Sequence, residues 1–160
     1  MFSLSSSTLD LSLQLTSDTL ENFDYIGLGF KVPSDPAGMT GADISVILLD
    51  GGASDRYAEK NGVPTLDKDL GGEDDNLNPV FNAETMTYKW SRPLMSKDSQ
   101  DGLDKEFIEG GDYVVVWASG IVQDGVLKYH RNNRGGVAIS LDSNQYGCLE
   151  EEEVNYMFIP

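Results

Sequence analysis

The sequence predicts an all-β protein, organised as a single antiparallel β-sandwich domain of immunoglobulin-like type over residues 1–160. Short segments rich in strand-forming residues recur along the chain, and Gly, Pro and Asn separate them. No stretch of about ten residues shows helical periodicity. With 39% hydrophobic residues, the chain is long enough to bury one core.

Three strands are predicted in the N-terminal half. Residues 9–15 (LDLSLQL) alternate strictly, which predicts one buried face. Residues 24–32 (DYIGLGFKV) are apolar at both parities, and their Gly27 and Gly29 indicate burial on both faces, a bulge or a close backbone approach. Residues 44–49 (ISVILL) follow a proline-rich break and end in a DGG turn.

The segments around these strands are more polar. Residues 18–22 are predicted to form a turn, 54–60 a short strand or a helical turn, and 67–78 a long exposed connection. Residues 85–92 alternate and end at Pro93, whereas 96–110 are predicted to be a polar loop. Residues 113–118 (YVVVWA) predict a strand buried on both faces, and two shorter strands are predicted at 125–129 and 136–141.

The net charge of −16 argues against nucleic acid and anionic membrane surfaces as partners, because both carry negative charge. It fits a soluble domain, or a redox module that docks on a basic protein. No apolar run approaches the roughly 20 residues of a membrane span, and the N-terminal residues lack the pattern of a signal peptide. Cys148 has no second cysteine to pair with, and no CxxCH motif for covalent haem is present.

The side chains that could carry chemistry are few. The sequence contains no G-x-S-x-G nucleophile motif and no phosphate-binding glycine loop. Acidic residues in the 67–78 connection could hold calcium through oxygen ligands, although EF-hand spacing is absent and solvated charge is the alternative. These residues are Asp67, Asp69, Glu73, Asp74 and Asp75.

A haem site needs only two ligands from the protein. His130, in KYHRNNRGG, offers an imidazole nitrogen, and Met39, in GMTGAD, offers a thioether sulfur; such a pair completes a six-coordinate haem iron. Arg131 and Arg134 could pair with the haem propionates, and Gly27 and Gly29 could let the macrocycle lie against their strand. The residues alone leave open that His130 only caps a strand and that Met39 only fills the core.

Six stretches in order resemble a known family. They are YIGLGF (25–30), MTGAD (39–43), DRY (55–57) followed by Pro64 and Asp67, WSRPL (90–94) followed by Asp98 and Asp101, VVWASG (115–120), and YH to RG (129–135). Over residues 25–141 the chain resembles the DOMON domain, in the variety found in dopamine β-monooxygenase-like proteins and haem-binding cytochrome domains.

The resemblance implies a β-sandwich of roughly ten strands that binds haem b non-covalently or, in some members, a sugar. Haem-binding members ligate iron through residues at the positions of Met39 and His130. We therefore expect a one-electron transfer module that serves a redox partner protein or a neighbouring redox domain and is not an enzyme on its own. The alternative is a non-redox module that binds a sugar or a protein. The resemblance implies an extracellular or secretory-pathway location, but no signal peptide is evident, and Cys148 cannot supply the disulfide of secreted members.

Overall fold

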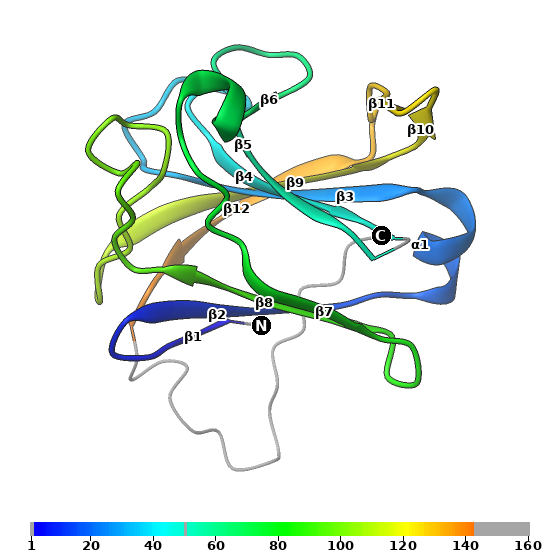
Figure 1. Cartoon of the computed structure of the whole chain (residues 1–160), viewed down its shortest axis with the longest axis horizontal. Helices are drawn as coiled ribbons and strands as arrows, with labels where there is room; N and C mark the ends of the chain where they lie inside the picture. The colour runs from blue at the N-terminus through cyan, green and yellow to red at the C-terminus, as the bar shows by residue number, and fades with distance from the viewer. Residues whose placement is uncertain (1, 50, 143–160) are drawn as a thin grey trace.

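The computed structural model describes residues 2–49 and 51–142. Two antiparallel β-sheets stack face to face, which confirms the predicted all-β sandwich (Figure 1). Cys148 and the acidic and aromatic residues near the end of the chain lie outside the described residues. Within the described residues, no helix is long and apolar enough to span a membrane.

The smaller sheet has four strands in the order β1-β2-β8-β7. They are β1 (Phe2–Leu4), β2 (Thr8–Gln14), β7 (Leu77–Asn82) and β8 (Thr87–Pro93). The larger sheet has six strands in the order β12-β9-β3-β4-β5-β6. They are β3 (Tyr25–Lys31), β4 (Asp43–Leu48), β5 (Ala53–Tyr57), β6 (Thr65–Leu66), β9 (Asp112–Gly120) and β12 (Arg134–Ser140). A separate hairpin joins β10 (Val122–Gln123) to β11 (Val126–Leu127).

The core lies between the sheets and follows the alternation of the strands. Leu9, Leu11 and Leu13 of β2 point inward and are at most 5% exposed, as the LDLSLQL pattern predicts. Each leucine buried in this way contributes about 1.5–3 kcal/mol. Tyr88 and Trp90 of β8 lie beside these leucines in the same sheet. The opposing side chains come mainly from β3 and β9, and include Ile26, Leu28, Phe30, Tyr113 and Val115.

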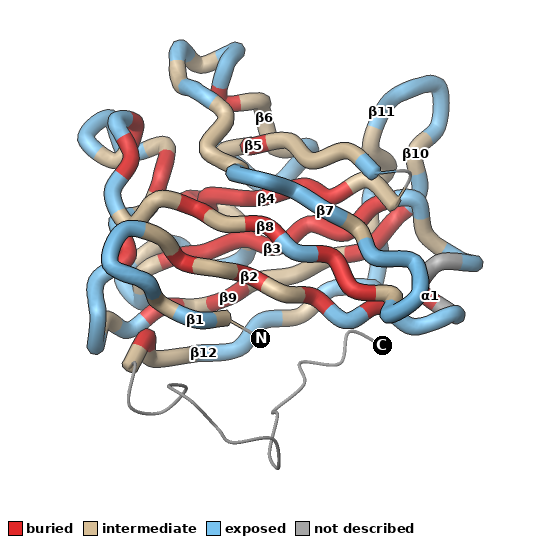
Figure 2. The backbone as a smooth tube through the Cα atoms, turned by 60° about the horizontal axis from the view of Figure 1, so that its bottom comes forward, coloured by how far each residue is buried: buried red, intermediate tan, exposed pale blue. Residues whose placement is uncertain are grey.

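The larger sheet is apolar on its outer face as well. Strand β3 lies at its centre, between β4 and β9, and all seven of its residues are buried, which confirms the predicted burial on both faces (Figure 2). A second apolar cluster covers this outer face, formed by Tyr25, Ala42, Ile44, Val46 and Ala58 with Met39, Val116 and Leu127 packed against it. A surface of this kind on a single domain indicates a binding site or an interface.

Several elements differ from the prediction. The segment predicted as a turn at 18–22 contains the short helix α1 (Ser17–Asn22), because the Thr16 hydroxyl accepts a hydrogen bond from the Thr19 N–H and caps its first turn. Strands β1 and β7 were not predicted; β7 is largely exposed and contains a register shift (Figure 2). Strand β1 is only three residues long, too short for its alternation to be diagnostic, and β7 has no alternation.

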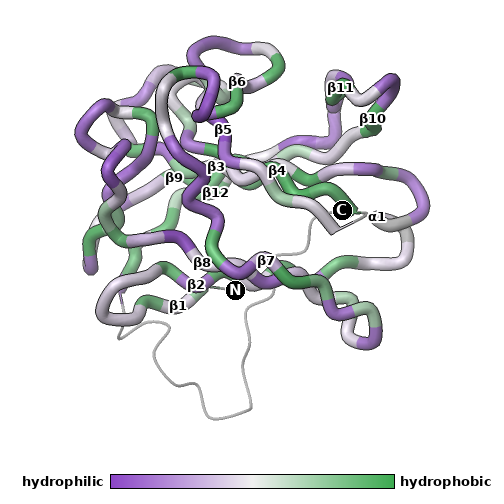
Figure 3. The backbone as a smooth tube through the Cα atoms, in the orientation of Figure 1, coloured by the Kyte–Doolittle hydropathy of each residue, from purple (hydrophilic) through white to green (hydrophobic). Residues whose placement is uncertain are grey.

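The 67–78 connection is not wholly exposed, so that prediction is wrong at its start. Residues Asp67–Leu70 form a 3₁₀ helix, η1, which ends at Gly71 with φ of 93°, and the Asp67 side chain is buried. Likewise, the 96–110 segment is a loop as predicted, yet it buries Asp98, Asp104 and Phe107. Figure 3 shows that the loops formed by these two segments are predominantly hydrophilic, which is why hydrophobic periodicity did not reveal the burial of some of their residues.

Candidate functional site

A cavity of about 980 Å³ lies over the outer face of the six-stranded sheet. Its volume is at the upper end of the roughly 300–1,000 Å³ that is typical of small-molecule and cofactor sites. Ile44 and Val46 of β4 and Val116 and Ala118 of β9 form apolar parts of its wall. Met39 and His130, 91 residues apart in the sequence (130 − 39), both line it. The structure therefore brings the two predicted haem ligands to one cavity.

The two glycines of β3 lie on the cavity side of the sheet. Gly27 pairs with Val46 and Ala118, and a Cβ built on it would lie 3.6 Å from the nearest atom, which is an ordinary contact. A Cβ on Gly29 would lie only 2.8 Å from Ile44 Cγ1. Gly29 is thus required by the packing of its neighbours, whereas Gly27 leaves space that belongs to the cavity.

The Met39 loop is held by hydrogen bonds from several directions. Lys31, only 4% exposed, donates through Nζ to the carbonyl oxygens of Pro36 and Gly38, the latter at 2.7 Å. The Met39 N–H donates to Asn61 Oδ1 at 3.3 Å, and the Met39 carbonyl accepts from Ala42 N at 2.9 Å. The loop that presents the thioether is therefore fixed to the end of β3 and to the loop after β5.

His130 lies in a turn that is anchored to the sheet. The Tyr25 hydroxyl donates to the Lys128 carbonyl at 2.7 Å, and Asn133 N donates to the His130 carbonyl at 3.0 Å. His130 Nδ1 lies 3.3 Å from the Arg131 carbonyl oxygen. A proton on Nδ1 satisfies this contact and leaves Nε2 as the nitrogen with a free lone pair, the arrangement common among metal-bound histidines.

The electrostatic environment favours a neutral His130. Burial lowers the pKa of His130, and the nearby charge of Arg134 lowers it further, whereas the contact with the Arg131 carbonyl acts in the opposite direction. Arg134 is held over the Tyr129 ring, with its guanidinium carbon 6.0 Å from the ring centroid and Nη1 donating to the Tyr129 hydroxyl at 3.1 Å. A neutral imidazole is the form that can bind a metal.

Cations gather at this cavity although the chain carries a net charge of −16. Lys31, Lys128 and Arg134 line it, whereas Asp35 is the acidic residue among its described lining residues. Asp35 is paired with Lys105 at 3.2 Å, so its charge is already offset. The lining thus suits an apolar molecule that carries negatively charged groups. Arg131, which was also expected to contact propionates, is exposed and does not appear among the described lining residues.

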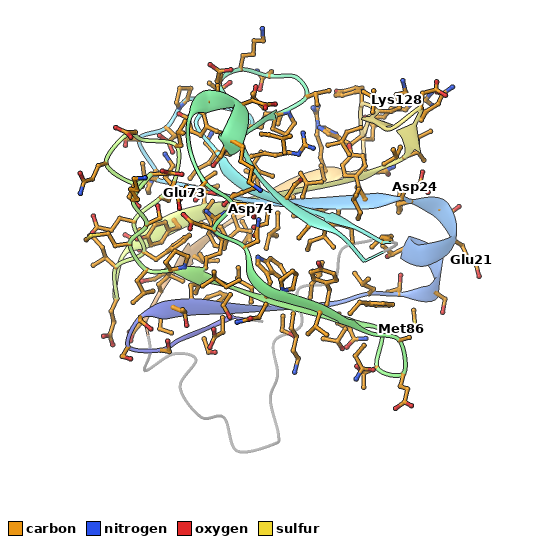
Figure 4. All side chains as sticks on the ribbon, in the orientation of Figure 1. Glu21, Asp24, Glu73, Asp74, Met86 and Lys128 are labelled. Carbon is orange, nitrogen blue, oxygen red and sulfur yellow. The ribbon has the colours of Figure 1, made fainter. Side chains whose placement is uncertain are left out.

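The acidic residues of the 67–78 segment lie elsewhere. In Figure 4, Glu73 and Asp74 lie toward the opposite end of the sandwich from Lys128, which lines the cavity. Lys97 pairs with Glu73 at 3.0 Å, and Lys68 approaches Asp74 at 3.8 Å. Asp69 is exposed, Asp75 is half-buried and Asp67 is buried. Only part of the predicted set is therefore placed in the protein interior.

A charge network whose burial and membership were not predicted from the sequence lies between the two sheets. Arg92 of β8, 1% exposed, donates to Asp43 at 2.6 Å and to Asp55 and Asp104 at 2.8 Å each. Burial acts to lower the pKa of Arg92, but the three aspartates outweigh it and raise that pKa. A signal was present in the sequence, since Arg92 follows Tyr88 and Trp90 at inward-facing positions of an alternating strand.

Comparison with known proteins adds no identification at the level of sequence: no protein-family model and no curated protein matches this chain.

Proposed function

We propose that this chain is a b-type haem-binding domain that transfers single electrons, with Met39 and His130 as the two axial ligands of the iron. The observation that carries the proposal is that both side chains line one apolar cavity. They are the ligand types that hold iron in low-spin electron-transfer cytochromes. Two of the six stretches that resemble haem-binding DOMON domains contain Met39 and His130, so the resemblance supports the same proposal.

The cavity has the further properties that this cofactor requires. Its floor at Gly27 carries no side chain, so a flat macrocycle can approach the backbone of β3. Lys128 and Arg134 lie at the same cavity and can pair with propionates, where a charged donor forms a stronger hydrogen bond than a neutral one. Apolar walls exclude water from the iron, which is one of the means by which proteins tune a reduction potential.

When bound, haem b supplies an Fe(III)/Fe(II) couple. Two protein ligands leave no open coordination position for a substrate, so the domain passes electrons and does not act on oxygen or an organic molecule. His130 contributes a neutral imidazole held by the contact of Nδ1 with the Arg131 carbonyl oxygen. Met39 contributes a thioether from a loop whose backbone is held by a hydrogen bond to Asn61. The proposed partner is a redox protein or a neighbouring redox domain that docks near this cavity.

An absorption spectrum tests the proposal directly. The purified protein, as isolated or after titration with haemin, is expected to show a sharp Soret band and the narrow bands of reduced low-spin haem. His130→Ala is expected to abolish low-spin ligation, and Met39→Ala to lower the potential and open a site for carbon monoxide. Met95→Ala is the matched control, because Met95 is 61% exposed and does not line the cavity.

Two outcomes would contradict the proposal. Protein that stays colourless after haemin titration does not bind haem, and the cavity would then serve a non-redox ligand such as a sugar. If His130→Ala and Met39→Ala both keep the wild-type spectrum, haem binds through other ligands. Lys128, two residues from His130 and also in the cavity lining, is the first substitute to examine.

A further inference from the structure

A second group of side chains, separate from the cavity, has the composition of a cation site. Among the described residues, five aspartates are at most 4% exposed: Asp43, Asp55, Asp67, Asp98 and Asp104. Arg92 is the cation that contacts them, and it binds only Asp43, Asp55 and Asp104. One guanidinium cannot neutralise five carboxylates, and burying an uncompensated charge costs several kcal/mol. The interior at this end of the sandwich therefore has an excess of negative charge.

Arg92 forms salt bridges with neither Asp75 nor Asp98, which lie beside Asp104. Carboxylate oxygens of Asp75, Asp98 and Asp104 all lie within 4.8 Å of one another. The side chains of Asp75 and Asp104 are within hydrogen-bonding range of each other. Two carboxylates can be this close only if a proton or a cation lies between them. Asp98 Oδ2 accepts a hydrogen bond from the Glu73 N–H at 2.5 Å, which holds the Asp98 carboxylate in place.

Asp67 provides independent evidence for a missing partner. Its side chain is fully buried, and neither carboxylate oxygen has a hydrogen-bond partner. Buried carboxylates are almost always paired or bound to a metal ion. The charges that act most strongly on Asp67 are those of Asp104 and Asp43. Asp67 thus adds a further buried carboxylate to the negative charge of these acids, and neither of its carboxylate oxygens has a hydrogen-bond donor.

The backbone at this point is shaped to bring the acids together. Helix η1 ends at Gly71 in the left-handed conformation, and Gly72 N then donates to the Asp67 carbonyl at 2.8 Å. A Cβ on Gly72 would lie 2.6 Å from Asp98 Oδ2 and 3.2 Å from the Asp67 carbonyl oxygen. The absence of a side chain at Gly72 therefore lets the Asp67 turn and the Asp98 carboxylate approach each other.

We propose that Asp67, Asp75, Asp98 and Asp104 form a calcium site that holds the loops around η1 and residues 96–104 against the sandwich. Calcium fits because the donors are all oxygens from flexible loop segments, and calcium accepts six to eight oxygen ligands in variable geometry. No histidine or cysteine lies among the four, which disfavours zinc and copper. None of the four lines the haem cavity, so this site does not depend on the proposed haem function.

The site differs from the one expected from sequence. Asp67 and Asp75 belonged to the expected set, whereas Asp98 and Asp104 come from the 96–110 loop and are brought in by the fold. Asp69, Glu73 and Asp74 are not part of it. Burial raises the pKa of Asp67 to about 7 and the pKa of Asp75 to about 6, as expected for carboxyls in an uncompensated cluster.

The test is calcium binding by the whole chain after treatment with EDTA and its removal. Isothermal titration is carried out at about 0.15 M salt, which screens diffuse binding to an acidic surface. The expected result is one calcium per chain. At a calcium concentration about a hundred times Kd, the melting temperature is expected to rise by about 5–10 °C. Magnesium is expected to give a smaller rise, because it needs a strict octahedral site.

Variants distinguish this site from general attraction to negative charge. Asp75→Asn and Asp98→Asn are expected to weaken calcium binding at least tenfold, while the EDTA-treated variants melt at or above the wild-type temperature because repulsion is relieved. Asp101→Asn is the matched control, since Asp101 is exposed and lies in the same loop as Asp98. The proposal is overturned if calcium does not bind saturably, if magnesium stabilises equally, or if Asp75→Asn binds calcium as the wild type does.

Discussion

Replacement of Arg92 by methionine is expected to destabilise the protein strongly at neutral pH. The change keeps an unbranched side chain but removes the guanidinium, which is 1% exposed and makes contacts of 2.6, 2.8 and 2.8 Å with three buried aspartates. Removing one partner from a buried ion pair costs about 3–5 kcal/mol, mainly because the other charge is left uncompensated. For a domain of this size, that loss lowers the melting temperature by about 6–20 °C.

The loss is expected to depend on pH in a defined direction. Burial raises the pKa of Asp55 to about 8 and that of Asp43 to about 6, and the charge of Arg92 opposes both shifts. Without Arg92 these pKa values rise further, so both carboxyls are protonated and neutral at pH 5. Carboxyls with raised pKa values favour the folded state at low pH, and this contribution is lost as the pH rises through the folded pKa. The cost of Arg92→Met should therefore be much smaller at pH 5 than at pH 8.5.

Urea denaturation followed by tryptophan fluorescence measures this effect. Trp90 is a suitable reporter, because its Nε1 donates to Ser45 Oγ beside the network. The experiment is performed with EDTA, so that bound metal does not contribute. Lys89→Met is the control, since Lys89 is exposed on the same strand and loses the same charge; its effect should stay within about 0.5 kcal/mol. A loss of less than about 1 kcal/mol for Arg92→Met, or a loss that is equal at both pH values, would refute the reasoning.

Two further predictions concern the cavity. Gly27→Leu is expected to preserve the fold and abolish haemin binding, because a Cβ at Gly27 has ordinary contacts and the added side chain fills the cavity. Gly29→Ala is expected to lower the melting temperature, because its Cβ would lie 2.8 Å from a neighbouring side chain. Equal melting temperatures of the two variants by circular dichroism would contradict this. Lys31→Met is expected to loosen the Met39 loop and let carbon monoxide bind the reduced haem protein, while Lys60→Met, on an exposed side chain, should not. A Lys31→Met protein that excludes carbon monoxide would show that Met39 does not need this brace.

Strand β4 contributes side chains to both the cavity and the Arg92 network. Ile44 and Val46 face the cavity, whereas Asp43 and Ser45 face the sandwich interior and contact Arg92. The same alternation therefore places apolar side chains on one face and a charge network on the other. The Arg92 network fixes the strand that carries one wall of the cavity, although it does not itself contact that cavity.

The strands that could be predicted are those that satisfy a local rule. Residues 9–15 alternate because one face meets the core, and residues 25–30 carry no charged side chain because both faces are covered. Helix α1 and strands β1 and β7 were missed, because a capping hydroxyl or an edge pairing stabilises each of them and none has a hydrophobic period long enough to recognise. Met39 and His130 were identified by residue type and motif, and the structure places both at one cavity.

The sequence by itself determined the all-β class, the burial of the glycine-containing strand on both faces and the scarcity of histidine and cysteine as metal ligands, since each follows from composition or local pattern. Only the tertiary structure decided which distant residues meet. It placed Lys31 beneath the Met39 loop, brought Arg92 to Asp43, Asp55 and Asp104, and buried Asp67 and Asp98 in loops that look solvent-exposed in sequence. Burial of a polar side chain depends on what packs over it, and hydrophobic periodicity contains no information about that partner.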